Sequence, residues 1–109
     1  MAKLHRLNTT RTKNVPAFFS RGEFQQLLDL YSRRVASGEW RDYAIDQHAG
    51  IATFSVFRHT HEQPLFKIAK RGPDNEFEVY SGPHRLKRTG SLREALSVLE
   101  SRRRLRVVS

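Results

Sequence analysis

The chain has 109 residues, which is enough for one domain and too few for two. It contains no cysteine, which excludes a disulfide framework, a cysteine-ligated metal site and a thiol nucleophile. Lys and Arg number 20 against 11 Asp and Glu, so the formal net charge is +9. No apolar run approaches the roughly 18–20 residues that span a bilayer, and the basic first residues lack the apolar stretch of a signal peptide. We therefore expect a cytoplasmic protein without a membrane segment.

The positive charge is concentrated at the two ends of the chain. Residues 1–14 carry four basic residues and no acidic one, and residues 85–109 carry eight basic and two acidic residues. Residues 15–84 are close to neutral, with eight basic and nine acidic residues. We expect residues 1–14 to be a flexible basic arm, residues 15–104 to be one domain and residues 105–109 to be a C-terminal tail.

The first predicted helix follows Ser20. The sequence Ser20-Arg21-Gly22-Glu23 has the form of a capping box, with Ser at the N-cap and Glu three residues into the helix. Apolar residues then recur every three or four positions, and Gly38 is suited to end the helix. This apolar stripe consists of Phe24, Leu27, Leu28, Tyr31 and Val35.

Short alternating segments follow, and they predict an antiparallel meander of four to five short strands. Residues rich in Gly, Pro and Asn separate these segments, as turns require. In the fourth segment we expect Phe77 and Val79 to point into the core and Glu76 and Glu78 to face solvent. The segments are residues 41–47, 51–57, 65–70, 76–80 and 85–88.

A second helix is predicted at the C-terminal end. Ser91-Leu92-Arg93-Glu94 again has capping-box form, and Leu92, Ala95, Leu96 and Leu99 fall on one stripe. The order helix, meander, helix predicts an α+β fold with both helices packed on one face of the sheet. We expect that face to carry Phe54, Val56, Phe66, Ile68, Phe77 and Val79.

Several segments taken together resemble a known family. They are Gly38–Asp46, which contains Trp40-Arg41-Asp42-Tyr43, then Phe54–Arg58, Pro64–Ile68, and Leu86-Lys87-Arg88 followed by Leu92 and Leu99. From Phe18 to Glu100 the chain resembles a family of small bacterial proteins, mostly alphaproteobacterial, that is classed only as a domain of unknown function. The resemblance implies a bacterial single-domain protein. It implies no reaction, ligand or catalytic residue.

Basic residues toward the two ends are the candidate contacts for a polyanion. Arginine pairs well with phosphate, and basic segments bind nucleic acid in a salt-dependent way. The run Arg102-Arg103-Arg104 also has an explanation without a ligand, because cations at the end of a helix interact favourably with the helix dipole. Consecutive helical residues point about 100° apart, so these three arginines cannot form one face while they are helical. Joint action of the two ends requires that they meet on one face. The candidates are Lys3, Arg6, Arg11, Lys13, Arg85, Lys87, Arg88, Arg102, Arg103, Arg104 and Arg106.

Trp40 and Tyr43 admit two interpretations. They are candidates for stacking on a nucleic-acid base, with Arg41 as a phosphate contact. Alternatively, both rings cover the edge of the core, which is the more common place for a large aromatic residue in a small domain.

Motifs for catalysis and metal binding are weak in this sequence. His59-x-His61-Glu62 has metal-ligand residue types, but three ligands so close together rarely complete a site, and a surface loop explains the whole motif. There is no Gly-rich phosphate loop, no His-Glu-x-x-His and no Gly-x-Ser-x-Gly. We therefore expect that the protein is not an enzyme and that it binds no cofactor, metal ion or small-molecule substrate.

The leading hypothesis is a binding module for nucleic acid or another polyanion. The alternative is a protein-interaction or regulatory adaptor that uses an exposed strand edge or the first helix and binds no nucleic acid.

Overall fold

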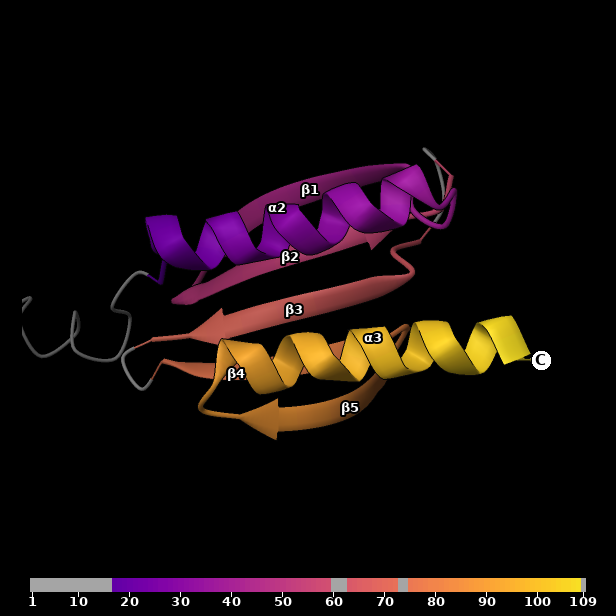
Figure 1. Ribbon diagram of the computed structural model, residues 1–109. Helices are drawn as coiled ribbons and strands as arrows, with labels where there is room; N and C mark the ends of the chain where they lie inside the picture. The colour runs from indigo at the N-terminus through magenta and orange to yellow at the C-terminus, as the bar shows by residue number, and fades with distance from the viewer. Residues whose placement is uncertain (1–16, 60–62, 73–74, 109) are drawn as a thin grey trace, which may run out of the picture.

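A five-stranded antiparallel sheet carries both helices on the same side (Figure 1). The computed structural model describes residues 17–59, 63–72 and 75–108, with side chains described to residue 101. Strand order in the sheet follows the chain, as in a meander, and the predicted α+β fold is confirmed. The elements are α2 (Arg21–Ala36), β1 (Asp42–His48), β2 (Ile51–Phe57), β3 (Phe66–Arg71), β4 (Glu76–Ser81), β5 (His84–Thr89) and α3 (Leu92–Val108).

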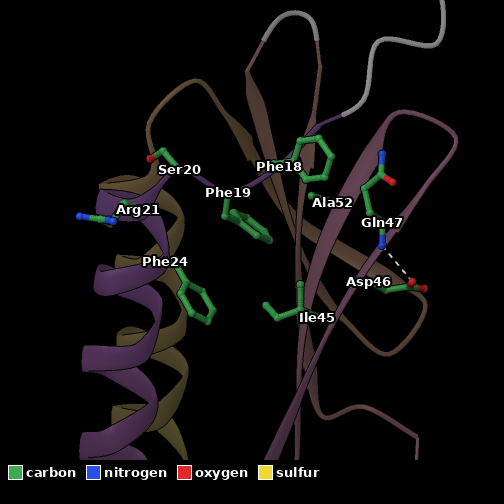
Figure 2. Close-up of a pocket in the computed structure, with 9 residues that line it drawn as sticks. All are labelled: Phe18, Phe19, Ser20, Arg21, Phe24, Ile45, Asp46, Gln47 and Ala52. Atoms are coloured by element: carbon green, nitrogen blue, oxygen red, sulfur yellow. Dashed lines mark hydrogen bonds between the residues drawn. The ribbon is translucent and has the colours of Figure 1, made fainter.

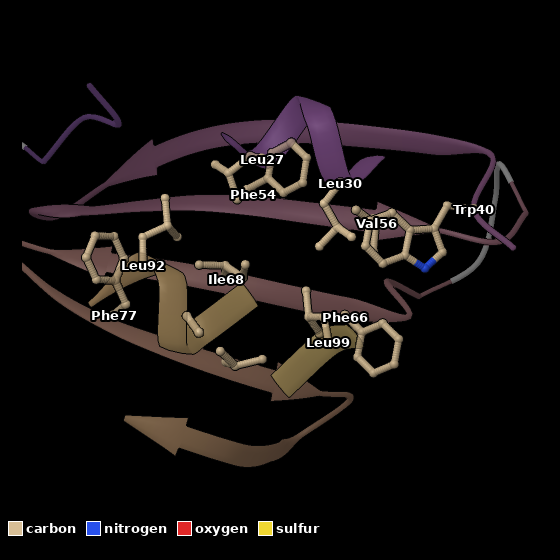
Figure 3. Close-up of a cluster of buried hydrophobic side chains, with 12 residues drawn as sticks. Leu27, Leu30, Trp40, Phe54, Val56, Phe66, Ile68, Phe77, Leu92 and Leu99 are labelled. Atoms are coloured by element: carbon tan, nitrogen blue, oxygen red, sulfur yellow. The ribbon is translucent and has the colours of Figure 1, made fainter. Parts of the chain in front are cut away.

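The hydrophobic core lies between the sheet and the helices (Figure 3). Alternate residues of the three central strands point into it, because side chains of a strand alternate between its two faces. All six side chains predicted for the inner face are buried there. The core cluster consists of Leu27, Leu30, Trp40, Phe54, Val56, Phe66, Ile68, Phe77, Val79, Leu92, Ala95 and Leu99.

The buried stripe of α2 differs from the predicted one. Leu30 is 1% exposed and Arg34 is 7% exposed, whereas Val35 is 40% exposed. Leu27, Leu30 and Arg34 are spaced by three and four residues and so form one face of the helix. The expectation that Val35 belongs to the core was wrong, because the face of α2 that is buried carries Leu30 and Arg34 instead.

The helix caps are formed by the predicted serines. At α2 the capping box is complete: the Glu23 N–H donates to Ser20 Oγ at 3.1 Å, and the Ser20 N–H donates to Glu23 Oε1 at 2.8 Å. At α3 the Glu94 N–H donates to Ser91 Oγ at 3.3 Å, but the Glu94 carboxylate accepts from the Thr89 hydroxyl at 2.7 Å. The second capping box is therefore only half formed, because a residue of β5 takes the carboxylate.

The backbone of α3 is helical to Val108. Residues 105–108, which we assigned to a tail, therefore continue the helix. The proposed domain boundary at residue 104 remains a prediction.

Candidate functional site

The face of the sheet opposite the helices carries charged and polar side chains, and we call it the open face. On β3 the residues that alternate with buried Phe66 and Ile68 project there. The register places Lys67 opposite Tyr80 and Ala69 opposite Glu78, so β4 contributes its own alternate residues to the same face. The open face of β3–β5 consists of Lys67, Ala69, Arg71, Glu76, Glu78, Tyr80, Arg85 and Arg88.

Glu78 is buried in the open face, and the expectation that it faces solvent was wrong. Its side chain is only 5% exposed. Oε1 accepts hydrogen bonds from the Tyr80 hydroxyl at 2.9 Å and from Arg71 Nε at 3.3 Å. Oε2 accepts from Arg85 Nη1 at 3.3 Å. Tyr80 of the same strand and one arginine from each neighbouring strand thus take the place of water around this carboxylate.

The surroundings of Glu78 keep it ionised. Burial by itself raises the pKa of the carboxyl, but the hydrogen bonds from Tyr80 and Arg71 and the charges of Arg71 and Arg85 outweigh burial and hold the pKa below its ordinary value of 4.5. Burial and the hydrogen bond to Glu78 raise the pKa of the Tyr80 hydroxyl, which therefore stays protonated and donates. The group is a fixed anion at neutral pH with three donors aimed at it.

Positive charge exceeds negative charge on this part of the open face. The side chains of Arg71 and Arg85 are 47% and 49% exposed, so half of each guanidinium arm remains accessible. Lys67 Nζ lies 5.2 Å from the centroid of the Tyr80 ring, a cation–π arrangement. Four cations, Lys67, Arg71, Arg85 and Arg88, stand against the two carboxylates Glu76 and Glu78, an excess of two positive charges.

A separate apolar pocket of about 400 Å³ lies between the start of α2 and the edge strand β1 (Figure 2). Phe24 of α2 and Ile45 of β1 project into the gap between the two elements, and Phe18 and Phe19 lie above them. Phe18 is 64% exposed and Ile45 is 46% exposed. Apolar side chains thus remain in contact with water at the β1 edge of the sheet, which is the edge opposite the Arg85 strand β5.

Only three of the eleven candidate polyanion contacts have described side chains. Arg85, Lys87 and Arg88 are exposed on β5. Lys3, Arg6, Arg11 and Lys13 lie outside the described residues, as do the side chains of Arg102, Arg103, Arg104 and Arg106. Both helices begin at the same end of the sheet, and α3 runs toward the other end (Figure 1). The described backbone therefore starts and finishes at opposite ends of the molecule, and it does not itself bring the two basic ends together.

The two candidate stacking residues pack within the protein. Trp40 is 3% exposed, and its ring lies 6.5 Å from that of Phe66. The Tyr43 ring is stacked on Phe54 at 5.3 Å and meets the Tyr31 ring edge-on at 4.9 Å. These contacts favour the packing interpretation, because a base could reach Trp40 only if the core opened.

Residues of β3 and β4 that we did not select from the sequence form the centre of the open face. The signal was present: the sequence predicts a turn at residues 72–75 between two alternating segments, and pairing these segments as a hairpin places Lys67 opposite Tyr80 and Ala69 opposite Glu78. Of the candidate metal ligands, His61 and Glu62 lie outside the described residues. Within the described ranges, no group of three His, Asp or Glu residues is arranged to hold a metal ion.

A family model matches most of the described chain. The model of the family described as protein of unknown function (DUF2794) matches residues 17–92, which include α2 and the whole sheet. The chain belongs to this family. The predicted resemblance to a domain of unknown function is therefore confirmed, and the family assigns no activity. No curated protein and no solved structure matches the chain. In the part of the chain that the structure describes, no helix is both long and apolar enough to cross a membrane.

Proposed function

We propose that the protein is a binding module for nucleic acid or another polyanion, and that the open face of β3–β5 is its contact surface. The observation that carries this proposal is the convergence of Arg71 and Arg85, from two different strands, on Glu78 between them. A guanidinium group has five N–H donors, and Glu78 accepts from one nitrogen of each arginine. The half-exposed arms keep donors for phosphate oxygens, which arginine binds well.

Glu78 contributes by holding the two arginines in place. Because this buried carboxylate already fixes both arginine side chains, they lose less conformational entropy when an anion binds. It also cancels one of their two charges, so the affinity of this pair alone is modest. Lys67 and Arg88 on the same face restore the positive excess, and the basic ends of the chain add to the attraction at longer range.

Salt dependence of binding tests the proposal. We would measure the affinity of the full chain for a fluorescein-labelled single-stranded 12-nucleotide DNA by anisotropy between 50 and 200 mM salt, where phosphate contacts weaken steeply. Each lost contact to a single strand reduces the slope of log affinity against log salt by about 0.7. The double variant Arg71→Gln and Arg85→Gln should therefore reduce it by about 1.4. Arg33→Gln is the matched control, because Arg33 lies on the helix layer in an exposed ion pair with Glu100.

A second variant separates the open face from the arm. Replacing Lys3, Arg6, Arg11 and Lys13 by Gln removes the four cations of the predicted arm without touching the sheet. We expect this variant to bind DNA more weakly, and we expect replacement of Arg71 and Arg85 in it to weaken binding further. If binding requires the arm and is unchanged in the variant that lacks both arginines, the open face is not the contact surface.

The apolar pocket favours the second candidate function, a protein-interaction module. Exposed Phe18 and Ile45 at a pocket of about 400 Å³ are suited to an apolar side chain of a protein partner. Ile45→Asp places a charge in the pocket and should abolish recovery of one stoichiometric partner, while DNA binding stays unchanged. If DNA binding is absent in the unaltered protein and such a partner is recovered, this second function replaces the first.

A further inference from the structure

The open face contains a hollow of about 230 Å³ beside the Glu78 cluster. Ala69 and Thr53, from β3 and β2, lie opposite one another in the sheet and line it. Tyr80, Lys67 and Arg71 line it from β4 and β3. The small Ala69 side chain leaves space between the larger residues that project outward around it. Of the two arginines that bracket Glu78, Arg71 lines the hollow.

The chemistry of the hollow suits a planar aromatic group with polar edges. Tyr80 supplies an aromatic ring that has Lys67 Nζ over one face, 5.2 Å from the centroid, and the Thr53 hydroxyl, Asp46 and His48 supply hydrogen-bonding groups around the rim. Typical sites for small organic ligands have volumes of about 300–1,000 Å³, so this hollow takes one flat ring rather than a complete cofactor. A nucleic-acid base has the required shape, edges and stacking surface.

The hollow lies close to a group that can contact the phosphate next to a bound base. Arg71 belongs both to the hollow and to the Glu78 cluster, and Arg85 lies beyond Glu78 on β5. A strand with one base in the hollow can therefore place its neighbouring phosphate on the exposed part of Arg71, with Arg85 farther along the same face. A duplex cannot use this arrangement, because its bases are paired and stacked inside the helix.

We propose that the open face binds single-stranded nucleic acid, with one unpaired base in the hollow over Ala69 and the adjacent phosphate on Arg71 and Arg85. This inference rests on the proposed function and adds the class of polyanion and the way in which it is held. It distinguishes the protein from a general polyanion binder, for which phosphates alone suffice.

The test compares a mixed-sequence single-stranded 12-nucleotide DNA with an abasic strand of the same length and charge, using fluorescence anisotropy on the full chain. The unaltered protein should prefer the strand with bases by at least about fivefold, the lower limit for stacking of one base on an aromatic side chain. It should also bind the duplex of that sequence more weakly than the single strand.

Three variants locate the preference. Ala69→Val fills the hollow without changing charge, and Tyr80→Leu removes the ring. Both should reduce the ratio of the two affinities toward one, and Ala69→Val should leave binding of the abasic strand unchanged. Tyr80→Leu also removes the hydroxyl that donates to Glu78, so its effect is compared with that of Tyr80→Phe, which removes the same hydroxyl. Tyr80→Phe keeps the ring and should keep the ratio, and circular dichroism would verify that each variant is folded.

Two results would overturn the inference, and they differ in meaning. Equal binding of both strands by the unaltered protein, or an equal loss for both strands in Ala69→Val, excludes a base in the hollow and leaves polyanion binding intact. Failure of the unaltered protein to bind either strand refutes the proposed function and, with it, this inference.

Discussion

Lys70 Nζ lies 2.7 Å from Glu23 Oε1, and this ion pair joins the centre of the sheet to the first turn of α2. Lys70 projects from the helix-facing side of β3 and is 8% exposed. Its ammonium also donates to the Phe18 carbonyl at 2.8 Å, and Glu23 accepts from the Ser20 N–H. The carboxylate that caps α2 is thus also the one that holds α2 on the sheet.

Loss of this ion pair should destabilise the fold. We expect Lys70→Ala to lower the free energy of unfolding by about 2–3 kcal/mol, because Glu23 and the Phe18 carbonyl lose a charged donor in a mostly buried place. Urea denaturation measures this change. Arg33→Gln is the control, since it breaks an ion pair with side chains 58% and 48% exposed. Equal losses in both variants would show that the buried pair has no special role.

Acid should weaken the fold through Glu23 and Glu78. The pKa of each carboxyl is held below its ordinary value of 4.5, by Lys70 and Ser20 at Glu23 and by Tyr80, Arg71 and Arg85 at Glu78, against the effect of burial. A carboxyl whose pKa is lower in the folded state stabilises the fold above its ordinary pKa, and this contribution disappears as pH falls through the lower value.

Denaturation in urea between pH 7 and pH 2 measures this dependence. Glu78→Gln should lose about 1–2 kcal/mol at pH 7, because two arginines lose a buried anionic acceptor. It should also show a shallower decline below pH 4.5. The control is Glu100→Gln, whose carboxylate is 48% exposed. A decline in Glu78→Gln as steep as in the unaltered protein would contradict the assigned cause.

Two aspartates cover polar groups on the free edge of β1. Tyr43 pairs with Val56, whose carbonyl accepts from the Leu65 N–H on the far side, so the Tyr43 N–H points away from β2. It donates instead to Asp42 Oδ1 at 2.8 Å. The Gln47 N–H donates in the same way to Asp46 Oδ1 at 2.9 Å (Figure 2).

Removing these carboxylates should promote self-association. An edge strand with free N–H groups pairs readily with another chain, and charged side chains on the edge oppose this. We expect the double variant Asp42→Ala and Asp46→Ala to sediment as larger species than the unaltered protein at equal concentration. Asp29→Asn, on the exposed side of α2, controls for loss of negative charge. Identical sedimentation of the unaltered protein and the β1 variant would show that the aspartates do not protect the edge.

Trp40 should report on the core and not on nucleic-acid binding. It is the only tryptophan in the chain, so its fluorescence is specific. We expect blue-shifted emission, little quenching by iodide and no change on addition of single-stranded DNA, because the ring is 3% exposed. Trp40→Ala should cost about 3–5 kcal/mol of stability. Quenching of Trp40 on binding of DNA would support the stacking interpretation instead.

The sequence by itself determined the order and type of the elements and the inward face of the sheet. Alternation in residues 51–57 and 76–80, and the capping box at Ser20, are local signals, because adjacent positions decide them. The family resemblance rested on such local segments as well.

Only the tertiary structure decided what surrounds Glu78. Arg71 and Arg85 are seven residues away from it on opposite sides in the sequence, and strand register brings all three together. The same holds for Leu30 replacing Val35 in the core, since the rotation of α2 depends on the sheet beneath it. Local periodicity specifies which way a side chain points relative to its neighbours in sequence. The burial and the charge environment of a side chain depend on residues of other strands, and only the pairing of the strands brings these residues next to it.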